Sequence, residues 1–245
     1  MRSLFFRGFD HIAFVCGCGH TGTTLMATIL SAHPDVFVPY QETEVYLRPW
    51  WRAIGSLRRL RAAALASGRL HLIEKTPRHV RRIAQIRRSL PRAKFLIMVR
   101  DGRDVTASLG RRKEGDFASG LARWLRDTEA SLEQRNNADT LVVRYEDLVS
   151  DPSATIRTVC VFLGVPFVET MLDYHKQTRL WYHRQEVTRT DGIGRSHEDL
   201  RNWQVNQPIF DGRGRWKSDL PEEFVAAFRI GRPRELMDAF GYSVD

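Results

Sequence analysis

Cysteine is scarce in this chain of 245 residues. Its three cysteines, Cys16, Cys18 and Cys160, cannot form a disulfide framework. Cys16 and Cys18 lack a second pair of ligands at zinc-site spacing, so no zinc site is expected. The cysteine pattern therefore predicts a protein of a reducing, cytoplasmic compartment with no structural metal.

Long apolar runs are missing as well. No stretch approaches the roughly 20 residues of a membrane-spanning helix. The first seven residues, MRSLFFR, carry no cleavage site of small residues. We therefore expect neither a transmembrane segment nor a signal peptide. The length fits one α/β domain, which we expect to span residues 1–245.

Lysine is rare too, so the net charge of +9 comes from arginine. Arginine suits bidentate contacts with phosphate, but a GC-rich genome produces the same bias. A basic surface also suits nucleic acid. Because no recognition helix, zinc finger or aromatic stacking motif accompanies it, a nucleic-acid-binding protein stays an alternative only.

Short apolar runs recur along the chain, with helical patterns between them. The runs are continuous rather than alternating, which is typical of strands covered on both faces. We expect an α/β fold of the P-loop type, in three layers, with a central, mostly five-stranded parallel sheet flanked by helices. The expected strands are residues 12–16, 36–38, 70–73, 95–99 and 141–143. The expected helices include residues 77–90, 117–132, 152–163 and 219–240.

Residues 17–24 read GCGHTGTT and follow the apolar run 12–16. A strand, a glycine-rich turn and a helix form a phosphate-binding loop, in which backbone N–H groups and the positive helix end face an anion. The spacing from Gly17 to Gly22 matches the Walker pattern, but Thr23 stands where that pattern has lysine. Triphosphatases use that lysine on the β- and γ-phosphates, so the loop is predicted to hold a phosphate without cleaving a triphosphate. A small-molecule kinase stays an alternative.

A second polar stretch follows the apolar run 95–99 and reads RDGRD. It opens with Arg100 and leads into an expected helix that carries Ser108 and Arg112. Ligands of parallel sheets gather at the carboxyl ends of the strands, so Arg100 is expected at the same edge as the loop 17–24. Two anion sites at one edge suggest a ligand with two separated phosphates. Alternatively, Arg100 pairs with Asp101 or Asp104 and merely ends the strand.

The two stretches together resemble the signatures of sulfotransferases that use 3′-phosphoadenosine-5′-phosphosulfate (PAPS). The similarity is greatest to the branch that contains the tyrosylprotein sulfotransferases, and it covers roughly residues 10–165. A weaker similarity follows at Gly214-Arg215-Trp216. The matching segments are TGTTLM (21–26), AHPDV (32–36), ET (42–43), EKTP (74–77), FLIMVRDGR (95–103) and YEDLV (145–149).

The resemblance implies a role for each matching residue. The backbone of Gly19, His20, Thr21 and Gly22, with the backbone and hydroxyls of Thr23 and Thr24, would hold the 5′-phosphate. The other residues of the PAPS site would be Arg100 and Ser108 at the 3′-phosphate, with Arg112 nearby, and Tyr145 and Arg215 at the nucleotide. Glu42 would be the general base, and Lys75 would stabilise charge on the leaving oxygen. No metal ion is expected, because lysine and the helix dipole replace it.

Several of these roles have alternatives. Glu42 could be a solvated loop acid, with Glu44 two residues on as the base, and Lys75 could be a surface lysine. His20 departs from the family, which usually carries lysine or arginine there, beside the transferring sulfonate. Imidazole is only partly charged near pH 7, so His20 would either be held protonated by the phosphosulfate of the donor or donate one hydrogen bond as a neutral ring. We therefore expect activity to fall with rising pH as His20 loses its proton, and expect a His20→Arg variant to lose this alkaline fall.

These observations predict a PAPS-dependent sulfotransferase that transfers a sulfonate to a hydroxyl or, less readily, an amine, releasing adenosine 3′,5′-bisphosphate (PAP). Residues 40–67 and 176–215 are expected to shape the acceptor site, the second as a lid. The acceptor is open among a small molecule, lipid, saccharide or peptide, and a homodimer is left open.

Overall fold

The computed structural model describes residues 11–177, 202–203 and 205–244. In this part of the chain five strands form one parallel sheet in the order β2-β3-β1-β4-β5. β1 is central, and its Phe14 lies opposite Glu74 of β3 and Phe95 of β4. The predicted five-stranded parallel sheet is thus confirmed. The strands are β1 (Ile12–Gly17), β2 (Val36–Phe37), β3 (His71–Lys75), β4 (Lys94–Val99) and β5 (Thr140–Arg144).

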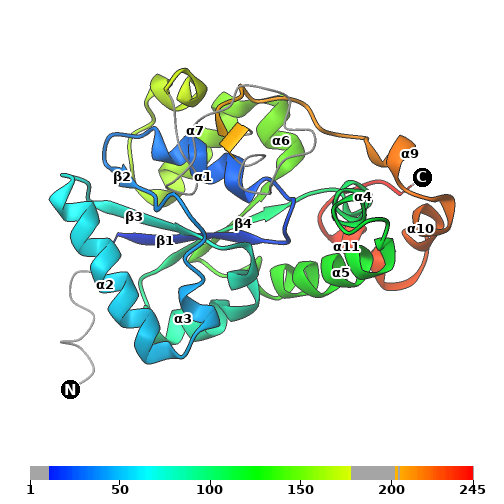
Figure 1. Cartoon of the computed structure of the whole chain (residues 1–245), viewed down its shortest axis with the longest axis horizontal. Helices are drawn as coiled ribbons and strands as arrows, with labels where there is room; N and C mark the ends of the chain where they lie inside the picture. Colours follow the sequence, from blue (N-terminus) through cyan, green and yellow to red (C-terminus); the bar gives the residue numbers. More distant parts are fainter. Residues whose placement is uncertain (1–10, 178–201, 204, 245) are drawn as a thin grey trace.

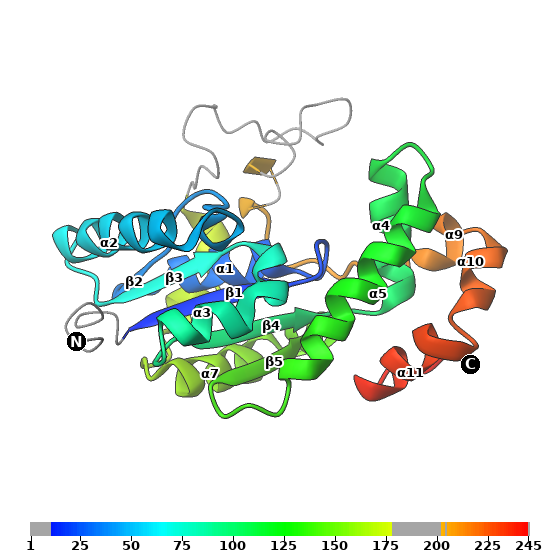
Figure 2. The ribbon, with the colours of Figure 1, turned by 90° about the horizontal axis from the view of Figure 1, so that it is seen from below.

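Alternate residues of β1 face two different layers of helices (Figures 1 and 2). Ile12, Phe14 and Cys16 belong to one hydrophobic cluster, whereas Ala13 and Val15 belong to the other. The first cluster includes residues of α2 (Trp50–Ala66), α3 (Ile83–Ser89), α4 (Gly102–Arg112), α5 (Phe117–Gln134), α10 (Glu222–Ala227) and α11 (Gly231–Ala239). The second includes residues of α1 (Thr23–Ser31), α6 (Tyr145–Ser150), α7 (Pro152–Leu163), η4 (Glu169–Met171) and η5 (Tyr174–Lys176).

Two expected helices are interrupted. The stretch 77–90 begins as a 3₁₀ helix, η3 (Pro77–Arg82), and becomes α-helical only in α3. The buried ring of His79 bonds Glu74 and the N–H of Tyr46, which holds this turn against the sheet. The stretch 219–240 is broken before α10, where Pro221 offers no N–H, and again at the start of α11, whose first residue Gly231 has a φ of 58°. A short α9 (Trp216–Asp219) precedes them.

Other elements follow the expected pattern more closely. α5 and α7 occupy the predicted stretches, and α7 ends at Gly164 in the left-handed conformation. The sequence pattern did not predict α2 or the short η2 (Val45–Leu47), which lie within residues expected to shape the acceptor site.

The carboxyl ends of four strands bring the predicted site residues to one edge of the sheet. β1 leads into the loop 17–24, β3 ends at Lys75, β4 ends just before Arg100, and β5 ends just before Tyr145. Because all strands are parallel, these four places share the edge at which ligands of such sheets bind. Among the described residues, no helix is both long and apolar enough to cross a membrane.

Candidate functional site

The loop 17–24 has the backbone of an anion cradle. Gly17 and Gly22 have φ angles of 139° and 89°, which side-chain-bearing residues rarely adopt. Gly22 is the N-cap of α1, which has neither a side-chain cap nor an acidic residue in its first turn. The first N–H groups of a helix have no intrahelical partner, so those of α1 are left for a ligand. Thr21 stabilises the turn by donating a 2.7 Å hydrogen bond to the carbonyl of Cys18.

Arg100 reaches this loop, as the two-anion interpretation requires. Its Nη1 donates to the carbonyl of His20 at 3.4 Å, and its Nη2 donates to the carbonyl of Gly212. Its guanidinium carbon lies 4.2 Å from the centroid of the Tyr145 ring. The alternative pairing with Asp104 is also present, at 3.4 Å. Within the described residues the buried Nε of Arg100 has no hydrogen-bond partner, so the guanidinium retains a donor for an anion.

Ser108 joins the two predicted anion sites. Its hydroxyl and the Nδ1 of His20 form a hydrogen bond of 2.7 Å, which links α4 to the loop. The imidazole of His20 therefore bonds a residue predicted to hold the 3′-phosphate. This contact places His20, Ser108 and Arg100 side by side.

Tyr145 packs against the loop and also holds a returning segment of the chain. A Cβ added to Gly22 would lie 2.9 Å from its ring. The Tyr145 hydroxyl donates to the carbonyl of Phe210 and accepts from the N–H of Gly212, both at 3.2 Å. Burial raises the pKa of this hydroxyl, which keeps it protonated as a donor.

Gly212 and the backbone contacts of Asp104 are features beside Arg100 that the sequence did not predict. Asp104 accepts the N–H groups of Gly214 and Trp216 at 2.9 and 3.0 Å, so it fixes the segment 210–216 beside Arg100. The sequence offered Asp104 only as an ion-pair partner of Arg100, and nothing near Gly212 marked that glycine in advance.

Two predicted residues lie at the margin of this cluster. Arg112 is the exposed last residue of α4, one turn beyond Ser108. Arg215 is exposed before α9, with its guanidinium carbon 5.9 Å from the Phe210 ring. Their contacts with a nucleotide stay predictions. Most of the expected lid, residues 176–215, lies outside the described residues.

Lys75 and Glu42 form an ion pair beside the loop. The Nζ of Lys75 lies 2.8 Å from Oε1 of Glu42, and Lys75 pairs in register with Val15 of β1. The lysine side chain is 1% exposed and the carboxylate 30%, so the pair meets solvent on the side of Glu42. Glu44, the other candidate base, instead pairs with the exposed Arg78. The geometry favours Glu42 as the carboxylate of the site.

The buried Glu74 anchors residues next to this pair through hydrogen bonds. It accepts hydrogen bonds from the hydroxyls of Thr43 and Thr76 and bonds His79. Burial alone would raise the pKa of Glu74, but His79 and the hydroxyls outweigh burial and hold that pKa below its usual value. Glu74 therefore fixes Thr43, the neighbour of Glu42, to the strand end that carries Lys75.

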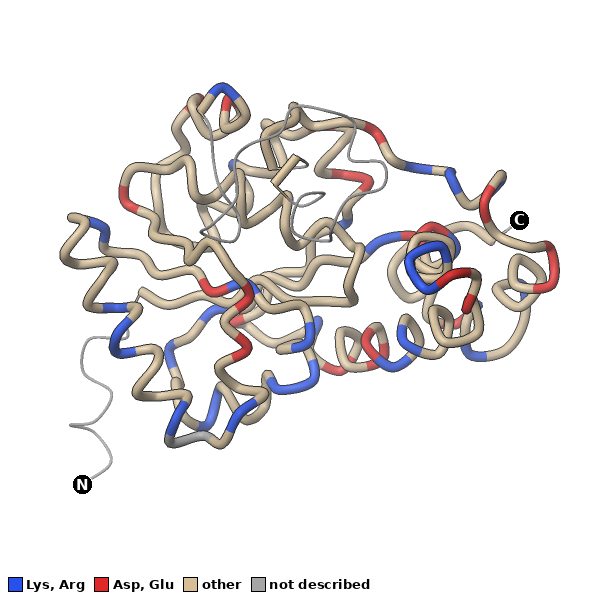
Figure 3. The backbone as a smooth tube through the Cα atoms, in the orientation of Figure 1, with Lys and Arg blue, Asp and Glu red and all other residues tan. Residues whose placement is uncertain are grey.

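Positive residues outnumber acidic ones most strongly in residues 45–92. Residues 45–92 contain twelve arginines and one acid, the buried Glu74. Figure 3 shows these positions along α2 and around α3. The arginine excess of the sequence is thus concentrated on one layer of helices.

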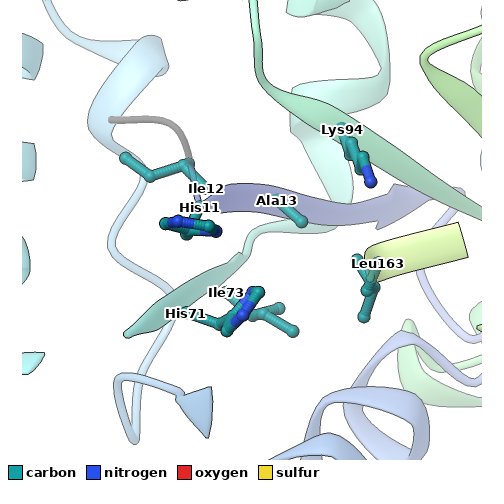
Figure 4. A pocket seen from close by; sticks show the side chains of 7 residues that line it. All are labelled: His11, Ile12, Ala13, His71, Ile73, Lys94 and Leu163. Carbon is teal, nitrogen blue, oxygen red and sulfur yellow. The ribbon is translucent and has the colours of Figure 1, made fainter. Parts of the chain in front are cut away.

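A small cavity at the amino end of the strands is separate from this site. It lies between His11, His71, Lys94 and Leu163 (Figure 4), at the edge opposite the loop 17–24. The described residues contain no group of histidine, cysteine and acidic side chains arranged to hold a metal ion.

Comparison with known proteins agrees with the site. A model of the sulfotransferase family matches residues 49–170, about half of the chain. Protein-tyrosine sulfotransferase 1 of Danio rerio is 27% identical over 94% of this chain and 72% of its own length. The Drosophila melanogaster protein-tyrosine sulfotransferase is 26% identical over 94% of this chain, which spans only 51% of that relative.

The fold leads to the same group of proteins. Mouse sulfotransferase SULT7A1, solved in complex with PAP, superposes with a TM-score of 0.62 at 14% identity, covering 99% of this chain and 92% of the mouse chain. The fold is thus that of a solved sulfotransferase. By the family model and the relatives that its sequence matches, the chain belongs to the sulfotransferase family.

Proposed function

We propose that this protein transfers a sulfonate group from PAPS to the hydroxyl of an acceptor. The observation that carries the proposal is the contact of Arg100 and Ser108 with the loop 17–24, beside the Lys75–Glu42 pair. Two anion-binding groups are thereby held a short distance apart, as a doubly phosphorylated adenosine requires. The unpartnered Nε of Arg100 and the uncapped start of α1 fit such a ligand.

In this proposal each residue of the site would have a separate role in binding or catalysis. The N–H groups of the loop and the hydroxyls of Thr23 and Thr24 would bind the 5′-phosphate, and Arg100 and Ser108 the 3′-phosphate. When bound, PAPS supplies the sulfonate and departs as PAP. Glu42 would accept the proton of the acceptor hydroxyl, a contribution typically worth about 10²–10⁴-fold in rate. Lys75 would stabilise the negative charge that develops on the leaving oxygen.

The curated relatives suggest the acceptor. Both are protein-tyrosine sulfotransferases by name, so we propose a tyrosine hydroxyl in a peptide as the first acceptor to test. Lipids, saccharides and other small molecules are the alternatives. A cytoplasmic location, a homodimer and a lid at residues 176–215 stay predictions.

Calorimetric titration with PAP, using ATP as the control, tests the class of donor. We expect PAP to bind at micromolar or lower concentration and ATP to bind at least about tenfold more weakly, since ATP has no 3′-phosphate for Arg100. Magnesium-dependent consumption of ATP would instead indicate a kinase. Steeply salt-dependent binding of RNA or DNA without affinity for PAP would indicate a nucleic-acid-binding protein.

A further inference from the structure

Gly19 lies against an arginine from a distant helix. A Cβ added to Gly19 would lie 2.7 Å from Nη2 and 3.1 Å from Cζ of Arg123, in α5. The φ of Gly19 is not among the positive values of the chain, so its backbone does not require glycine. The missing side chain instead leaves room for the guanidinium of Arg123 beside the loop.

Arg123 is oriented by a buried carboxylate. Its Nε faces Oδ2 of Asp127 at 3.5 Å, while its Nη2 end faces Gly19. Asp127 is 0% exposed, and Nε of Arg81 lies closer to it, 3.0 Å from Oδ1. One negative charge thus faces two guanidinium groups, which leaves a net positive charge at the loop.

The loop itself lacks a permanent cation. Thr23 stands where the Walker pattern has lysine, and the one basic side chain of residues 17–24 is the imidazole of His20. The ring of His20 is also engaged with Ser108. An anion in the cradle would therefore meet N–H groups and hydroxyls, but no fixed positive charge from the loop's own side chains.

We propose that Arg123 supplies this charge from α5, in the space left by Gly19, with Asp127 and Arg81 as its positioning residues. The inference rests on the proposed function, because its ligand is the 5′-phosphate group of the donor. An ordinary pair within one helix would not account for the geometry, because the tip of the guanidinium faces the loop rather than Asp127.

Binding of two different nucleotides tests the two ends of the binding site independently. PAP carries both phosphates, whereas adenosine 3′-monophosphate offers only the group expected at Arg100 and Ser108. With Arg123→Gln we expect the affinity for PAP to fall about tenfold, as loss of a charge-assisted contact does. The affinity for adenosine 3′-monophosphate should stay within about twofold, measured by calorimetry at one ionic strength.

Arg126→Gln is the matched control. Arg126 is exposed on the same helix, so the variant removes the same charge while leaving the contact between Arg123 and Gly19 intact. We expect it to bind both nucleotides like the unchanged protein. Equal losses in the Arg126 and Arg123 variants, or equal losses for both nucleotides with Arg123→Gln, would overturn the proposal.

Gly19→Ala tests the same contact without removing a charge. Its methyl group would displace the guanidinium, so we expect a loss of PAP affinity similar to that of Arg123→Gln. The double variant should be no weaker than either single one, because both remove one interaction. Additive losses would overturn the proposal. If the unchanged protein binds adenosine 3′-monophosphate as tightly as PAP, the loop end is not an anion site and the proposal also fails. If it binds neither, the proposed function itself is wrong.

Discussion

At the scale of single residues, the Lys75–Glu42 pair combines two opposed requirements. Lys75 is buried, so it needs the carboxylate to offset the cost of desolvating its charge. A base, however, must be able to leave its partner and take a proton from the acceptor. The partial exposure of Glu42 meets this second requirement, because a bound acceptor can reach it from solvent. In the proposed mechanism the acceptor hydroxyl would take the place of Lys75 beside Glu42, and the leaving oxygen would take the place of Glu42 beside Lys75.

Replacing Glu42 by glutamine tests its assignment as the base. We expect kcat for transfer from radiolabelled PAPS to a tyrosine peptide to fall about 100-fold or more, since glutamine cannot accept the proton. PAP affinity should stay within about threefold. Glu44→Gln is the control and should retain most of the activity, because Glu44 pairs with the exposed Arg78. A larger loss in the Glu44 variant would reverse the assignment.

Acid sensitivity should depend on Glu74. The folded state lowers the pKa of this carboxyl below its ordinary value of 4.5, so Glu74 contributes stability above that pH. The contribution is lost as the pH falls below about 4.5 through the lower folded pKa. Glu74→Gln should be less stable by about 2–4 kcal/mol at pH 7, since His79 loses its buried partner, and should lose less further stability by pH 3.5. Urea unfolding at both pH values measures this, and equal acid losses in the two proteins would contradict it.

Which residues could be found from the sequence depended on how local their contacts are. The loop 17–24 acts through its own backbone, so its spacing was sufficient. Arg100 could be placed because it directly follows a buried strand. Asp104 was named as a partner of Arg100 because the two are four residues apart, and the structure has that pair. Arg123 and Gly212 come from a helix and a segment farther along the chain, and only the fold shows their contacts with the loop and with Arg100.

At the scale of elements, continuous apolar runs predicted all five strands to within about two residues at each end. Such runs are reliable because both faces of each central strand are buried. The helices were harder to predict. His79 bonds outside its own helix and imposes a 3₁₀ turn at residues 77–82, which no periodicity reveals. α2 alternates arginine with alanine and leucine around Gly55, so its apolar stripe is weak.

The join between β1 and the loop should not tolerate a side chain. A Cβ added to Gly17 would lie 2.2 Å from the carbonyl oxygen of Met98 in the neighbouring strand, at a φ of 139°. We expect Gly17→Ala to lower the free energy of unfolding by about 3 kcal/mol or more, because the backbone would be strained and β1 and β4 would be pushed apart. Gly68→Ala is the control: its φ is 74° with nothing within 4 Å, so only about 1–2 kcal/mol is expected. If chemical denaturation gave the same loss of unfolding free energy for both variants, β1 and β4 would be able to move apart without cost, and the prediction would fail.

At the scale of the whole molecule, one sheet divides the hydrophobic interior into two clusters, and each cluster contains at least one of the three cysteines. Cys16 and Cys18 lie in the cluster under α2, α3 and α5, and Cys160 lies in the cluster under α1 and α7. All three are buried. Because β1 contributes alternate residues to both clusters, neither layer can open without disturbing the strand that precedes the loop. The two clusters should therefore unfold together.

Thiol labelling measures this coupling directly. Burial raises the pKa of Cys160 to about 11, and it raises the pKa values of Cys16 and Cys18 well above their usual range. At pH 8 we expect no modification of the folded protein by iodoacetamide over an hour, because the thiolate is the reactive form. All three thiols should become reactive over the same range of urea concentration, coinciding with the loss of circular dichroism, as mass spectrometry of quenched samples would show. Labelling of Cys160 at a lower urea concentration than Cys16 and Cys18 would show instead that the α1–α7 layer opens first, and that the anion loop between the layers can be released without global unfolding.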